Sequence, residues 1–115
     1  MYSLTTKKTI AATACGLALL LAGTRLAAAK PGDAAKGKGV FEQCSVCHNS
    51  DSEERKMGPG LKGLFKREKL VNGKAMNEAN VRAFINAGSS NGMPSFADLL
   101  SDDERDDLIA FLKTL

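Results

Sequence analysis

The chain has 115 residues, enough for one small domain, and 43% of them are apolar, 25% charged and 5% aromatic. This composition excludes a collagen-like chain and a strongly disordered one. The formal charge of +3 comes from residues 1–29, and no basic run is interleaved with aromatic side chains. The sequence therefore gives no support to nucleic-acid binding.

Residues 1–29 have the pattern of a secretory signal peptide. Lys7 and Lys8 precede an apolar run from Ile10 to Gly23 that ends in small residues. The run is shorter than the ~20 residues that span a bilayer, and Arg25 also counts against the alternative of an uncleaved anchor. We predict cleavage after Ala29, export to the periplasm and a mature domain of residues 30–115.

Hydrophobic spacing in the mature chain predicts an all-α fold of about four helical segments and no strand. Each segment has a recognisable start or stop, such as a capping side chain or a glycine. The predicted apolar positions are Ala34, Gly37, Phe41 and Cys44 after an Asp33 cap; Leu61, Leu64 and Phe65; Val81, Phe84 and Ile85 between an Asn77 cap and a stop at Gly88; and Leu108, Ile109, Phe111, Leu112 and Leu115 after the capping box that Ser101 opens.

The most informative motif is Cys44-Ser45-Val46-Cys47-His48, which contains both cysteines of the mature chain and its one histidine. Two thiols three residues apart project from one short helical segment, so both can add to the vinyl groups on one edge of a haem. The imidazole that follows can then bind the iron. The motif predicts covalent attachment of one haem c.

Three other interpretations of the motif are less favoured. A thioredoxin-like dithiol needs a βαβ setting, whereas the flanking patterns are helical. A structural zinc site needs four ligands, and Cys44, Cys47 and His48 provide three unless a carboxylate completes the set. A disulfide between cysteines so close in sequence would stabilise the chain little.

With these motifs, residues 32–115 strongly resemble the class I cytochromes c, in a compact bacterial form without Trp. The resemblance implies crossing terminal helices, carried by Gly37-x-x-x-Phe41 and Leu108-x-x-Phe111. In Gly58-Pro59-Gly60-Leu61 it implies that the Pro59 carbonyl accepts a hydrogen bond from the ligand histidine. It also implies a haem-propionate contact for Arg67 and, in Asn91-Gly92-Met93-Pro94, a methionine that is the sixth iron ligand.

The choice of Met93 also has a physical basis. A thioether is a soft ligand that favours Fe(II), so His48 and Met93 together would raise the potential and fill both axial sites. Met57 lies in the loop expected on the histidine side and Met76 at the entry to a helix, whereas Pro94 helps to fix the turn at Met93.

The sequence thus predicts a monomeric electron carrier and not an enzyme. It would pass single electrons between redox proteins, membrane-bound or soluble, that the sequence does not identify. The mature chain carries an excess of four basic residues in its first half and of four acidic residues in its second, which could orient a docking partner. The alternative function is a haem enzyme or gas-binding sensor with an open sixth iron site.

Overall fold

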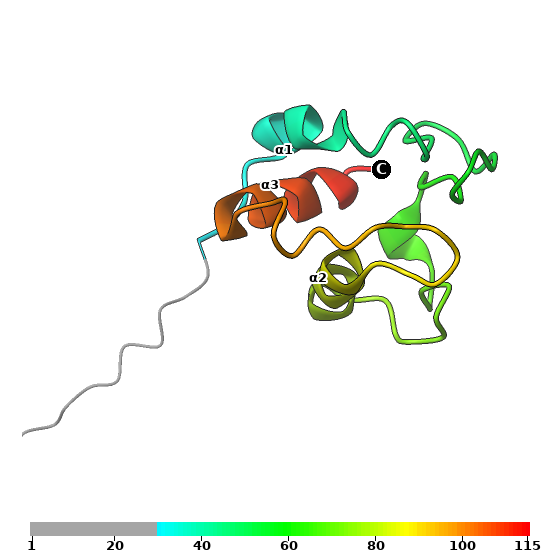
Figure 1. The fold of residues 1–115 in the computed structure, drawn as a ribbon. Coiled ribbons are helices and arrows are strands. Elements are labelled where there is room, and N and C mark those ends of the chain that lie inside the picture. Colours follow the sequence, from blue (N-terminus) through cyan, green and yellow to red (C-terminus); the bar gives the residue numbers. More distant parts are fainter. Residues whose placement is uncertain (1–29) are drawn as a thin grey trace, which may run out of the picture.

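The fold consists of three α-helices and one short 3-10 helix connected by long loops (Figure 1). The structure, a computed structural model, describes residues 30–115; the predicted signal peptide lies outside them. The helices are α1 (Ala34–Phe41), η1 (Leu64–Lys66), α2 (Glu78–Ala87) and α3 (Asp102–Leu112). This part of the chain contains two isolated β-bridges and no strand, so the predicted all-α fold is confirmed. None of its helices has the length and apolar character needed to cross a membrane.

The terminal helices α1 and α3 pack against each other at a glycine (Figure 1). A Cβ atom at Gly37 would lie 2.8 Å from the Cβ of Phe111 and nearer still to the carbonyl oxygen of Asp107. Beside this contact, the rings of Phe41 and Phe111 meet with centroids 5.3 Å apart at 52°, a tilted geometry favourable for aromatic pairs. The close approach of the two helices therefore depends on the missing side chain.

Side-chain caps begin all three α-helices, as the sequence predicts. Asp33 accepts hydrogen bonds from the backbone N–H groups of Ala35 and Lys36, and Asn77 accepts one from Asn80. Ser101 and Glu104 form a complete capping box at the start of α3. Because these bonds satisfy backbone donors that have no partner within the helix, they fix where each helix starts.

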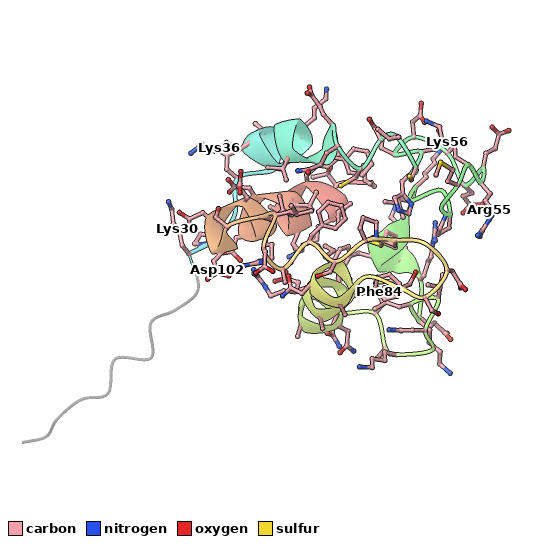
Figure 2. The ribbon with its side chains drawn as sticks, in the orientation of Figure 1. Lys30, Lys36, Arg55, Lys56, Phe84 and Asp102 are labelled. Carbon is pink, nitrogen blue, oxygen red and sulfur yellow. The ribbon has the colours of Figure 1, made fainter. Side chains whose placement is uncertain are left out.

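The first helix is shorter than predicted. It ends at Phe41, and Cys44 lies in the turns that follow, where its N–H donates to Phe41 O over 2.7 Å. Phe84, on α2 (Figure 2), also differs from the prediction. It lines a surface pocket with Asn72 and Lys74 and does not join the apolar core. The helical spacing predicts the position of Phe84 on α2. Tertiary packing decides whether a loop covers that position, and the local pattern does not contain this information.

The apolar core is small for the length of the described chain. Its eight buried residues come from all four helices and the loop before α3: Phe41, Leu64, Val81, Ile85, Leu100, Leu108, Ile109 and Leu112. Ten further apolar side chains pack against this core while staying partly exposed. A domain of this size buries too little apolar surface to be very stable without a further element.

Candidate functional site

The two cysteines and His48 lie on consecutive tight turns directly after α1. The N–H groups of Cys47 and His48 both donate to Cys44 O, over 3.1 and 2.9 Å. These bonds keep the segment helical in character, so side chains three residues apart project from neighbouring positions. The two cysteines form no disulfide, and Cys44 is partly buried against the core.

The environment of Cys44 does not suit a redox-active dithiol. Burial, and to a lesser extent the neighbouring Cys47, raises the pKa of the Cys44 thiol from its ordinary value near 9.0 to about 11. Nucleophilic thiols in redox enzymes have lowered pKa values, because the thiolate is the reactive form. The Cys44 site therefore disfavours a thioredoxin-like interpretation of the motif.

The ring of His48 is oriented by a single hydrogen bond and by close packing. Its Nδ1 lies 2.8 Å from Pro59 O, and because a carbonyl can only accept, Nδ1–H is the donor. In the neutral ring this leaves Nε2 unprotonated and able to bind a metal. On one side of the ring, a Cβ at Gly58 would lie 2.7 Å from Nδ1 and 2.9 Å from Nε2, so only glycine fits there.

Backbone hydrogen bonds join the loop that carries Pro59 to the cysteine turn and to Asn49, at the start of the loop. Gly58 N–H donates to Cys47 O over 2.8 Å, and Leu61 N–H donates to Asn49 O over 2.7 Å. The Nη2 group of Arg67 donates to Gly60 O and Lys62 O, at 2.8 and 3.0 Å. The structure thus places Arg67 against this loop, where its guanidinium holds two backbone carbonyls.

Met93 lies in the loop between α2 and α3 and is partly buried against the core. Its carbonyl accepts from Ser89 N–H over 2.9 Å, which closes the turn at residues 89–93. Gly88, with φ of +68°, precedes this turn, and a Cβ there would lie 2.7 Å from the carbonyl carbon of Pro94. The backbone at Met93 is therefore fixed from the end of α2.

The other two methionines of the described chain have different surroundings. Met57 is 76% exposed, and its sulfur lies 3.9 Å from the Cys47 sulfur. Met76 is partly buried against the core at the entry to α2, and its N–H donates to Glu68 O over 2.9 Å. The structure thus puts Met57 on the same loop as Pro59, on the side of the cysteine turn.

These surroundings fit a haem. The apolar side chains that pack on the core while staying partly exposed include Leu61, Phe65, Met93 and Phe96, which come from different loops and from η1. A flat apolar macrocycle can cover such side chains and enlarge the core. Within residues 30–115, no group of three or more His, Cys, Asp and Glu side chains gathers to hold a metal ion.

Comparison with known proteins agrees with this chemistry. The family described as cytochrome c matches residues 34–115, which include every motif above. The chain belongs to the cytochrome c family. It is a haem-based electron-transfer protein, and like other members of the family it binds haem c covalently. Cys44, Cys47 and His48 are consistent with the Cys-x-x-Cys-His motif of such attachment.

Three of the similar proteins are bacterial cytochromes. The cytochrome c2 of Rhodospirillum rubrum is 30% identical over 128 aligned residues, covering 89% of this chain and 95% of that protein. The cytochrome c2 of Blastochloris viridis is 43% identical over 72 residues, 61% of this chain, and the match spans about half of that protein (55%). Cytochrome cH from Methylobacterium extorquens has a similar structure, with a TM-score of 0.57, 28% identity and coverage of 73% of this chain and 100% of that one.

Sequence reasoning missed two contributors to the site of this cytochrome. Gly58 packs on the His48 ring, and its position beside Pro59 was the only signal in the sequence. Arg105 lies in α3 among charged residues that suggest a solvated face, yet it is buried and donates to the loop that carries Met93. No local pattern marks this role, because the partners that tie Arg105 to the loop and to α2, Ala97 and Asn86, lie 8 and 19 residues away in the chain.

Proposed function

We propose that this cytochrome shuttles single electrons through a haem c whose iron is bound by His48 and Met93. The observation that carries this proposal is the His48 ring, which is held by Pro59 O at 2.8 Å with Nε2 left available. Met93 is the preferred partner because it is partly buried and fixed in a turn. Met57 belongs to the loop that already packs on the histidine side.

The residues of the chain prepare the electron-transfer site in three ways. Cys44 and Cys47 would hold the haem covalently from a turn that is closed by backbone bonds to Cys44 O. The Pro59 carbonyl fixes the orientation of the His48 ring and raises its basicity. The apolar side chains around the site exclude water, so a thioether can keep its place against water as a competing ligand.

Bound haem c would supply the Fe(III)/Fe(II) couple. One redox protein would donate an electron to it, and another would accept the electron from it. With His48 and Met93 holding the iron in both states, rearrangement would stay small, which suits a carrier more than an enzyme. Arg67 is proposed to contact a haem propionate, a proposal supported by its place against residues 60–62.

An absorption spectrum of the ferric protein tests the proposed ligands. A weak band near the red end of the visible range marks methionine bound to ferric haem, and we expect it in the unmutated protein. A high-spin spectrum with rapid cyanide binding would instead favour the alternative, a haem enzyme or gas sensor with an open sixth site. Redox titration of the same sample then gives the potential.

We further propose that the protein is exported to the periplasm and works there as a monomer with other redox proteins. The pattern of residues 1–29 supports export, and the bacterial cytochromes c2 and cH are consistent with it. Lys56 and Arg55 lie on the exposed loop beside the cysteine turn, far from Lys30 and the start of α3 (Figure 2). N-terminal sequencing of the periplasmic protein should begin at Lys30, and a start at Met1 would contradict cleavage.

A further inference from the structure

Arg105 is a buried cation that joins three parts of the structure. It is 9% exposed, and its Nη1 donates to Asn86 Oδ1 at 3.1 Å and to Ala97 O at 3.0 Å. Its Nη2 donates to Asp102 Oδ1 at 2.8 Å. One guanidinium on α3 therefore links the first turn of its own helix, the last turn of α2 and the loop between the two helices.

That loop, residues 88–101, is the segment that carries Met93. At its start, Ser89 N–H donates to Met93 O, and in its middle Phe96 N–H donates to Ile85 O over 3.1 Å. Both of these ties run to residues in or next to the end of α2. The bond from Arg105 to Ala97 O is different, because it anchors the loop to α3 and so to the crossing of the terminal helices.

We propose that Arg105 is a positioning residue that holds the 88–101 loop against α3 and so keeps Met93 in place as an iron ligand. The inference rests on the proposed function, in which Met93 is that ligand. Arg105 acts through the loop and does not itself contact the iron.

The chemistry of the site supports positioning more than simple stabilisation. The ion pair with Asp102 contributes little net stability, because the Asp102 side chain is 88% exposed and water screens the attraction. The cost of burying the guanidinium is visible here, because Nε of Arg105 is buried with no hydrogen-bond partner. What the guanidinium supplies is geometry: a planar fork whose donors fix a carbonyl, an amide and a carboxylate on separate elements.

Imidazole binding to the ferric protein measures how often the loop releases Met93. Imidazole competes with the thioether for iron, so its apparent affinity follows the fraction of molecules in which the loop is open. Arg105→Met keeps the length and apolar stem of the side chain and removes the donors. We expect imidazole to bind roughly ten- to hundredfold more tightly, the effect of losing hydrogen bonds from a charged group.

Arg82→Met is the matched control. Arg82 also links α2 to α3, but its partners are Asp106 and Asp102, on α3 itself. This variant loses the ion pairs between α2 and α3 and leaves the bond from Arg105 to Ala97 O in place, so its imidazole affinity should stay within about threefold of the unmutated value. If Arg105→Met does not accumulate, Arg105→Lys replaces it. Lysine keeps the positive charge but lacks the planar guanidinium, so we expect an intermediate gain in imidazole affinity.

The outcomes separate this inference from the proposed function. If the unmutated protein shows the methionine band and the Arg105 variants bind imidazole no more tightly than Arg82→Met, the positioning role is wrong while Met93 ligation stands. An absent methionine band in the unmutated protein would overturn both. A gain in affinity confined to the Arg105 variants, with a matching weakening of the methionine band, supports the inference.

Discussion

Replacing Gly58 with alanine should disturb the His48 ring directly. The added methyl group would lie 2.7 Å from Nδ1 and 2.9 Å from Nε2, whereas ordinary van der Waals contact begins at 3.4 Å. The methyl group would lie nearer still to Cε1, so the ring or the loop must move by roughly 1 Å. A shift of the ring away from Gly58 by that amount would stretch the bond of 2.8 Å to Pro59 O beyond hydrogen-bond range.

The energetic effect has two parts. Inserting a methyl group into a tightly packed site costs about 1–3 kcal/mol, and loss of the His48 hydrogen bond adds about 1 kcal/mol. We expect Gly58→Ala to lower the free energy of unfolding by about 2–4 kcal/mol. The midpoint potential should change as well, because the hydrogen bond sets the basicity of the ligand nitrogen.

Guanidinium unfolding followed by far-UV circular dichroism, together with a redox titration, checks both effects. Gly39→Ala is the control: a Cβ at Gly39, in α1, meets nothing within 4 Å. That substitution should raise stability by about 0.5–1 kcal/mol, as expected for glycine to alanine inside a helix. A Gly58→Ala protein with unchanged stability and potential would refute the packing argument at His48.

Three further variants test other parts of the site. Replacing both Cys44 and Cys47 with alanine should leave an exported chain without fixed tertiary structure; a cooperative melt with dispersed amide signals would show that haem is not part of the core. Met93→Ala should keep the haem attached and admit exogenous ligands. It should also lower the potential by more than the ~60 mV that corresponds to a tenfold change in the equilibrium constant of a one-electron couple. An unchanged spectrum and potential would make Met93 a packing residue. Hydrogen bonds from the Ser101 backbone and hydroxyl lower the pKa of Glu104. This carboxylate therefore stabilises the fold above its unfolded pKa, and that stabilisation is lost as the pH falls through the lowered value. At several acid pH values, the stability of Glu104→Gln should fall less steeply than that of the unmutated protein, and an identical pH profile would contradict the linkage.

Local signals allowed the helix starts and the haem motif to be predicted. Asp33, Asn77 and Ser101 cap their helices because each side chain bonds to a backbone N–H two or three residues further on. Such contacts lie within one turn and depend on neighbouring residue types alone. The same holds for the turn that presents Cys44 and Cys47, whose bonds close within four residues.

Features that depend on distant contacts were not predictable. The apolar spacing continues to Cys44, but α1 ends at Phe41. Arg105 has a charged sequence context typical of a solvated face and is buried because the Met93 loop covers it. Phe84 has the correct helical phase to join the core and lines a surface pocket instead. Each of these outcomes is decided by which loop covers which helix, and that information is spread over the whole chain.

The two sides of the site therefore depend on the fold to different degrees. The cysteines and His48 come from five consecutive residues, and their turn is held by bonds within that stretch, so haem attachment needs little of the folded domain. Met93 lies 45 residues beyond His48, and its loop is held by the end of α2 and, through Arg105, by α3. Bringing this proposed ligand from so far along the chain requires the helices to be packed first. Substitutions that loosen the contacts between helices should therefore weaken methionine ligation, and with it the potential, well before they affect attachment of the haem.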